Sequence, residues 1–288
     1  MSFSYLLLSI VFSTLINLIF NWFKTYQINK IQAIVVNYFV CFVIGFSFSD
    51  QKEIIRNLST EWFQYCFILG TLFVAIFFCM ALTTEKFGVS VNAVSTKMSV
   101  VIPVIFVSFF TGENISFVFV IGLIFSLISI YLITQKEKST WSKKLTYLPI
   151  LVFLGSGTID TSLKILESSY SHEIPLSTII YSIFLGAFII GFFVLLLTSY
   201  FKFNQWNTKS TMAGIVLGVP NYFSIFFLLY SIQAFSMKSS FVFGINNIAI
   251  VLLSTIFSVI IFKEKLSFKN KLGIFTSVLS IILIAYAS

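Results

Sequence analysis

The chain has 288 residues, of which 58% are hydrophobic and only 10% are charged, and its mean hydropathy is +1.00. Soluble domains carry about a quarter charged residues, so this composition excludes a soluble enzyme or binding domain and indicates an integral membrane protein. The net charge of +8 does not indicate nucleic-acid binding, because the lysines are scattered through short polar stretches and form no single patch.

Ten apolar segments follow one another along the chain, each close to the ~20 residues that a helix needs to cross ~30 Å of hydrocarbon. Stretches such as Ile68 to Ala81 do not alternate polar and apolar residues, which excludes the strands of a membrane barrel. The sequence therefore predicts an all-α integral membrane protein with ten transmembrane helices, roughly at residues 3–23, 33–49, 60–83, 88–110, 115–134, 146–165, 175–199, 210–233, 239–262 and 267–287.

Two stretches, 151 positions apart, carry the same pattern of residues. Glu, Ser, Phe, Gly, Ser, Ser and Leu recur at identical spacing, as Glu113, Ser116, Phe117, Gly122, Ser126, Ser129 and Leu132 and then as Glu264, Ser267, Phe268, Gly273, Ser277, Ser280 and Leu283. We therefore expect a first five-helix repeat at 1–134, a polar linker at 135–145 and a second five-helix repeat at 146–288. Because five is an odd number, the second repeat is expected to be inverted relative to the first, as in many secondary transporters.

Lysine and arginine are distributed unevenly between the two sides of the predicted bundle. The loops between helices 1–2, 3–4, 5–6, 7–8 and 9–10 hold 13 of them, whereas the opposite side holds Lys52, Arg56, Lys164 and Lys238. The positive-inside rule applies to such short loops. It predicts a multi-pass protein of the cell inner membrane with these five loops in the cytoplasm and both termini outside.

Residues 88–104, followed by Gly112-Glu113 and a glycine-containing helix, resemble the drug/metabolite transporter superfamily, in particular its EamA-like branch. Asn246-Asn247 followed by residues 262–267 looks like the second copy of the same motif. The family's first-helix signature is partly met, by Lys24 in the first repeat and by Gly157 and Lys164 in the second. The likeness extends over the whole chain in helix count and at motif level over about 88–133 and 239–284.

This resemblance implies a ten-helix fold in which helices 1–4 and 6–9 surround a central cavity and helices 5 and 10 are peripheral. It also implies transport of small metabolites by alternating access, often as export. Members of the family are often described with both termini in the cytoplasm, and the lysine count predicts the opposite orientation for this chain.

Lys97 is the most informative charged residue, because it lies about nine residues into the fourth predicted helix, roughly 13 Å deep. An ammonium group there costs ~3 kcal/mol or more unless it faces a cavity or a partner. It could attract a carboxylate or phosphate of the substrate. It could instead pair with a fixed carboxylate or a helix C-terminus and only hold the bundle together.

Asn246 and Asn247 lie at a depth equivalent to that of Lys97 in the other repeat, so we expect them near the midplane, where transporter sites lie. Asn17, Asn92 and Asn221 are further candidates for lining this substrate site. The alternative is that these amides only bond neighbouring helices, at about 0.6 kcal/mol each.

Asp160 lies four residues before Lys164 on the same face of the sixth predicted helix. A carboxylate at this depth could carry a proton and couple transport to the proton gradient. The alternative is a local ion pair with Lys164.

Glu113 and Glu264 precede helices and, because of the inversion, are expected on opposite faces of the membrane. We assign them structural roles, since a carboxylate stabilises a helix N-terminus by roughly 0.3–1 kcal/mol. Gly122 and Gly273, in the helices that follow, are likewise assigned to structure.

These features favour a secondary active transporter that moves a small anionic or zwitterionic metabolite by alternating access, with its site around Lys97 and with protons as a candidate coupling ion. The alternative substrates are neutral amino acids, sugars or drug-like compounds. An enzyme is not expected, because the sequence lacks clustered acids or a Ser/His system within the membrane, and a channel or scaffold fits an inverted repeat less well. One histidine and no cysteine pair at ligand spacing predict no metal site, and no cofactor is expected.

Overall fold

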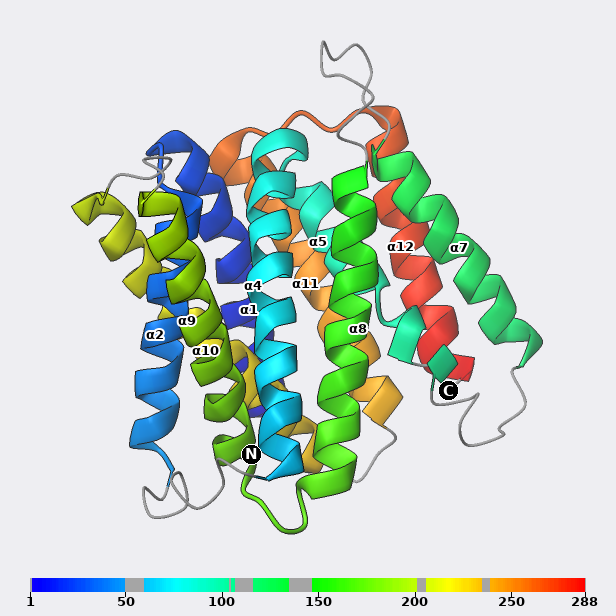
Figure 1. Cartoon of the computed structure of the whole chain (residues 1–288). Helices are drawn as coiled ribbons and strands as arrows, with labels where there is room; N and C mark the ends of the chain where they lie inside the picture. Colours follow the sequence, from blue (N-terminus) through cyan, green and yellow to red (C-terminus); the bar gives the residue numbers. More distant parts are fainter. Residues whose placement is uncertain are drawn as a thin grey trace.

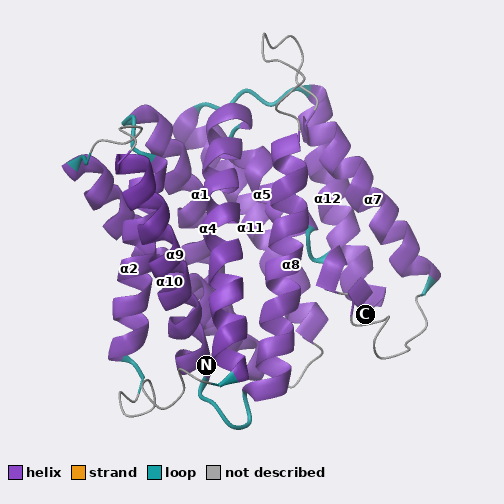
Figure 2. Ribbon diagram, viewed as in Figure 1, coloured by secondary structure: helices purple, strands orange, loops and turns teal. Residues whose placement is uncertain are grey.

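The computed structural model describes residues 2–49, 60–103, 105–106, 116–134, 147–200, 206–234 and 239–287. These residues form an all-helical bundle without any strand (Figures 1 and 2). The bundle is composed of α1 (Ser2–Thr25), α2 (Lys30–Ser47), α4 (Glu61–Phe87), α5 (Val89–Met98), α7 (Phe117–Thr134), α8 (Tyr147–Tyr170), α9 (Leu176–Tyr200), α10 (Thr208–Ala234), α11 (Ser239–Phe262) and α12 (Phe268–Ala287).

Seven of these helices are long and apolar enough to cross a membrane, namely α1, α2, α4, α8, α9, α10 and α11. Helices satisfy all their backbone hydrogen bonds within one segment, which a bilayer requires of a spanning chain. The described part of the protein is therefore that of a multi-pass membrane protein, as its composition predicts.

The predicted fourth helix is not continuous. α5 ends at Met98, Ser99 and Val100 form a turn, and the chain is helical again from Val101. Pro103 explains this break, because a proline has no N–H and its ring clashes with the carbonyl group four residues earlier, here that of Ser99. The break places Lys97 in the last turn of α5.

Two groups of helices build the core. Helices α1, α2, α4, α8, α9 and α10 share one large apolar cluster, and α5, α7, α11 and α12 share a second one with Phe153 of α8. α7 and α12 lie side by side at one edge of the bundle (Figure 1). This position agrees with the expectation that the fifth and tenth helices are peripheral.

The helix ends that carry most of the described lysines meet at one end of the bundle, which we call the lysine-rich end. Lys30 at the start of α2 forms an ion pair with Glu85 near the end of α4 (2.5 Å). Asn29 donates its backbone N–H to Ser210 (2.9 Å), which brings the start of α10 to the same end. Lys24 and Lys265 line a common cavity there.

Candidate functional site

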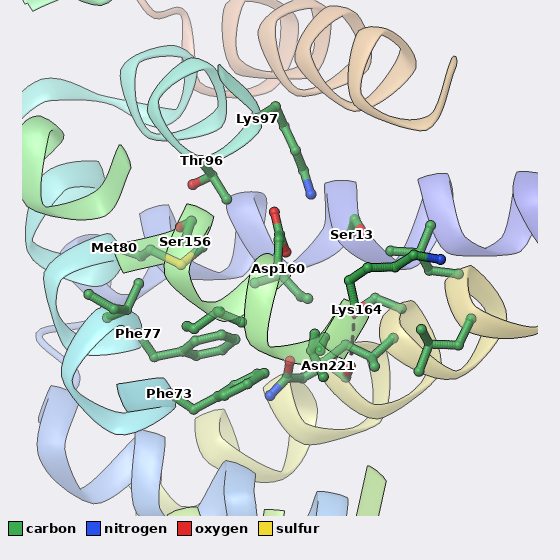
Figure 3. Close-up of a pocket in the computed structure, with 18 of the residues that line it drawn as sticks. Ser13, Phe73, Phe77, Met80, Thr96, Lys97, Ser156, Asp160, Lys164 and Asn221 are labelled. Atoms are coloured by element: carbon green, nitrogen blue, oxygen red, sulfur yellow. Dashed lines mark hydrogen bonds between the residues drawn. The ribbon is translucent and has the colours of Figure 1, made fainter. Parts of the chain in front are cut away.

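A cavity of about 120 Å³ lies between α1, α4, α5, α8 and α10. Its wall is apolar on the side of α4, where Phe73, Phe77 and Met80 lie (Figure 3). The polar residues of the wall come from α1, α5, α8 and α10 and are Ser13, Asn17, Thr96, Lys97, Ser156, Asp160, Lys164, Glu167, Asn221 and Ser224. Such a site, mostly apolar with a few converging polar groups, is typical of small-molecule binding.

Lys97 of α5 and Asp160 of α8 point toward one another in this cavity (Figure 3). Among the described residues, no carboxylate oxygen lies within 4.0 Å of Lys97 Nζ, and this ammonium group donates no hydrogen bond. The Asp160 carboxylate accepts one long hydrogen bond, from Ser99 Oγ (3.4 Å). The cavity thus holds two opposite charges that face each other without direct contact.

Lys164 does not pair with Asp160, although the two lie one helical turn apart. It forms its ion pair with Glu167 instead, at 3.2 Å, and the two side chains are 33% and 16% exposed. The local ion pair considered for Asp160 from the sequence is therefore wrong. The reason lies in packing, because α5 is placed against α8 and its Lys97 occupies the space in front of Asp160.

Two of the five predicted asparagines line the cavity and a third bonds one of them. Asn17 and Asn221 are in the wall. Asn92 lies outside it, fully buried, and donates a hydrogen bond from Nδ2 to Asn17 Oδ1 (2.9 Å). Asn221 donates to Asn37 of α2 (3.1 Å). These amides therefore bond helices together, and Asn17 and Asn221 also face the cavity.

Asn246 and Asn247 do not line this cavity. α11 packs against α1 and α5, and these two helices form part of the cavity wall, whereas no described residue of α11 does. The Asn246 side chain is fully buried, and neither its oxygen nor its nitrogen has a hydrogen-bond partner among the described residues. Position along the helix was the only basis for placing these residues at the site, and it does not tell which neighbour their helix face meets.

Glu264 lies at the N-terminus of α5, not at that of the helix which follows it. Ser90 Oγ donates to its Oε2 (3.4 Å), and a Cβ atom added to Gly88 would collide with its carboxylate. Gly88 has φ = 100°, a conformation that favours glycine. α12 is capped instead by Ser267, whose Oγ accepts from the N–H of Asn270 (3.2 Å). Glu113 lies outside the described residues.

Gly122 and Gly273 lie in the contact between α7 and α12. A Cβ atom on Gly273 would lie 3.0 Å from the backbone nitrogen of Ile133, and one on Gly122 would lie 2.9 Å from a side-chain carbon of Ile284. Glycine therefore lets these two helices approach closely at both positions.

The sequence analysis missed Ser99 and Glu167. Ser99 could have been found, because Pro103 predicts a helix break at the carbonyl four residues before it, beside Lys97. Glu167 follows Lys164 at the i,i+3 spacing at which helix neighbours interact. Within the described ranges, no three His, Cys, Asp or Glu side chains form a group that could hold a metal ion.

No protein-family model matches the chain. A protein of Haemophilus influenzae that is described as uncharacterized is 29% identical over 266 residues, which is 88% of each chain. A solved crystal structure aligns with 98% of this chain and 95% of its own, with a TM-score of 0.62 and 16% sequence identity. This likeness shows that the fold occurs in an experimentally determined structure.

Proposed function

We propose that the protein is a secondary active transporter that moves a small anionic or zwitterionic metabolite by alternating access. The observation that carries the proposal is the cavity within the bundle, in which the ammonium group of Lys97 faces the carboxylate of Asp160 without bonding it. Ionisable residues inside a membrane bundle are costly and mark substrate and ion pathways.

The interrupted helix supports the same function. α5 stops beside the cavity, and the Ser99 hydroxyl in the break shares its single hydrogen between Thr96 O (2.6 Å) and Asp160 Oδ2 (3.4 Å). Transporter sites are often formed by such discontinuous helices near the membrane midplane. Lys97 lies in the last turn of α5, where its positive charge is attracted to the negative end of the helix dipole. This attraction keeps the amine at the cavity when no anionic substrate is bound.

Two inverted repeats are part of the proposal, and reciprocal contacts between α7 and α12 support them. Ser280 Oγ donates to the carbonyl oxygen of Gly122 (2.7 Å), and Ser129 Oγ donates to that of Gly273 (2.8 Å). Gly122 and Gly273, and likewise Ser129 and Ser280, are 151 positions apart. Two units related by a two-fold axis make such mutual contacts, in which each residue meets the equivalent of its partner.

A second reciprocal pair joins α2 and α9. A Cβ atom on Gly45 would lie 2.6 Å from Tyr181 Cβ, and one on Gly191 would lie 3.0 Å from a side-chain methyl of Val35. Gly45 and Gly191, and likewise Val35 and Tyr181, are 146 positions apart. The same symmetry thus accounts for close approaches in two separate helix pairs, which supports rocking of one repeat against the other as the transport motion.

Substitution of Lys97 tests the proposal. The purified protein is screened by thermal shift against carboxylates, phosphates, zwitterions and neutral sugars, and compounds that stabilise it are used for counterflow in proteoliposomes. We expect Lys97→Ala to remain folded, although less stable, and to lose both the stabilisation by anions and the counterflow, at least tenfold. Lys164→Ala is the control, because Lys164 lines the same cavity and already has Glu167 as its partner.

The other outcomes separate the alternatives. Normal transport by Lys97→Ala would refute an anion site and favour neutral amino acids, sugars or drug-like compounds as substrates. Binding without any counterflow would refute a carrier and favour a membrane-embedded enzyme or scaffold. Placement of the lysine-rich end in the cytoplasm is also proposed, and modification of Lys265→Cys from the outside of intact cells would contradict it.

A further inference from the structure

A second cavity, of about 650 Å³, opens at the lysine-rich end of the bundle. It is lined by the end of α1, the junction of α4 and α5, the end of α7 and the loop between α11 and α12. Its charged residues are Lys24, Glu85, Lys86, Glu264 and Lys265. Both carboxylates have partners, since Glu85 pairs with Lys30 and Lys86 and Glu264 accepts from Ser90. Lys24 and Lys265 together carry one positive charge more than Glu264, whose carboxylate the serine hydroxyl does not neutralise, so this cavity attracts anions.

The two cavities share no lining residue but come within about one helical turn, ~6 Å, of each other. On α1, Asn17 lines the central cavity and Asn21 lines the outer one. On α4, the same step separates Met80 from Thr84. On both helices the outer cavity therefore begins about one turn beyond the central one, toward the lysine-rich end, and a thin barrier separates them.

Polar side chains from three helices form this barrier. Asn92 of α5 donates from Nδ2 to Asn17 Oδ1 (2.9 Å), and Asn17 donates from its own Nδ2 to Ser254 Oγ of α11 (3.1 Å). Asn92 and Ser254 are fully buried and Asn17 is 3% exposed. Beside them, Phe20 packs edge-on against Phe77, which belongs to the wall of the central cavity.

This barrier is made to open more readily than a packed apolar core. It depends on two side-chain hydrogen bonds, which are weak constraints between membrane helices. The Asn92 Oδ1 atom is buried and has no partner among the described residues. A partly satisfied polar network gains hydrogen bonds when water or a polar solute enters it. These new bonds offset part of the free energy needed to separate the helices.

We propose that the outer cavity is the mouth of the transport pathway at the lysine-rich end and that Asn17, Asn92 and Ser254 form the gate that closes it from the Lys97 cavity. This inference rests on the proposed transport function for its purpose, but the gate itself is defined by contacts within one structure. An anion attracted by Lys24 and Lys265 would pass between α1, α5 and α11 to reach Lys97.

Thiol labelling tests the gate without any need for transport. Cys41, Cys66 and Cys79 are replaced by alanine, and Ser13→Cys is introduced as a reporter, because Ser13 lines the central cavity one turn beyond Asn17. Lys265→Cys in a parallel protein identifies which side of sealed membrane vesicles carries the lysine-rich end. A charged, membrane-impermeant methanethiosulfonate is then added from that side.

We expect the reporter to be protected from that side, and Asn92→Ala to raise its labelling rate at least tenfold. Asn37→Ala is the matched control, since it removes an equally buried amide that bonds Asn221 outside the barrier, and it should leave the rate unchanged. Should Asn92→Ala fail to fold, Ser254→Ala deletes a single oxygen of the same network and carries the test.

Protection that persists in the gate variants would overturn the proposal, as would an equal rise in Asn37→Ala. Counterflow together with unchanged labelling in the gate variants would refute the gate but would still support the proposed transport function. Faster labelling in a protein that shows no counterflow would support the gate and refute the transport function.

Discussion

A double-mutant cycle on Lys97 and Asp160 measures whether these two charges stabilise each other across the cavity. Two unit charges 4 Å apart attract by about 4 kcal/mol at an effective dielectric constant of 20. The structure places no carboxylate oxygen within 4.0 Å of Lys97 Nζ among the described residues, so about 4 kcal/mol is the upper limit. We expect a coupling free energy of roughly 1.5–3 kcal/mol, in the range measured for interacting pairs.

The single variants should be less stable to unfolding than the double variant. Lys97→Met or Asp160→Asn leaves one charge without its counterpart inside the bundle, and we expect each to lower the free energy of unfolding by about 2–4 kcal/mol. Removing both charges should restore most of this loss. The assay is reversible denaturant unfolding in mixed micelles, followed by the fluorescence of the four tryptophans.

Lys164 and Glu167 provide the control cycle. These side chains form an i,i+3 ion pair and are partly exposed, so their coupling should be only about 0.3–0.5 kcal/mol. Additive effects of Lys97→Met and Asp160→Asn, or a coupling no larger than that of the control pair, would refute the electrostatic reasoning about the site.

Three further predictions follow from the site and its helices. Asp160→Asn should abolish the dependence of uptake on an imposed pH gradient, measured in proteoliposomes, because it removes the carboxylate that would carry the proton. Gly70→Ala should lower the thermal unfolding temperature, by an overpacking loss of about 1–3 kcal/mol, because the new Cβ would lie 2.5 Å from the backbone nitrogen of Ala187. Pro103→Ala should make α5 continuous past Ser99, slowing hydrogen exchange in that turn and weakening counterflow.

Each of these predictions has its contrary outcome. Unchanged pH-driven uptake would limit Asp160 to holding Lys97 in place. Gly191→Ala is the control for Gly70, since its new Cβ would meet side-chain carbons and no backbone atom, the nearest being a methyl of Val35 at 3.0 Å. An equal loss of stability in both variants would contradict the close packing of α4 against α9. Exchange that stays fast in Pro103→Ala would show that proline does not cause the break.

The all-helical, multi-pass class and the positions of the described helices could be predicted from the sequence with good accuracy. The bilayer leaves only helices or closed barrels as spanning structures, so hydropathy and the lack of alternation suffice. The interruption at Ser99 was missed, since apolar residues continue through it and only Pro103 marks it. Lys97 was found for the same physical reason, because a charge within an apolar helix must have a cavity or a partner.

The partner of that charge was not predictable from local spacing. Lys164 is four residues from Asp160, and the i,i+4 rule favoured that pair, yet Lys164 bonds Glu167 and Lys97 faces Asp160. In the same way, Asn246 was assigned to the substrate site from its depth, whereas no described residue of α11 lines the cavity.

The sequence by itself determined that this protein lies in a membrane as a helical bundle and which residues are too polar to face lipid. These properties depend on the free energies of transferring single side chains and backbone groups from water to hydrocarbon. Those free energies can be read for each segment without knowing its neighbours. Only the tertiary structure decided which polar groups meet, where the cavities lie and what separates them. Those properties depend on which helix faces pack together, and residues such as Lys97 and Asp160, 63 positions apart in the chain, become neighbours only through that packing.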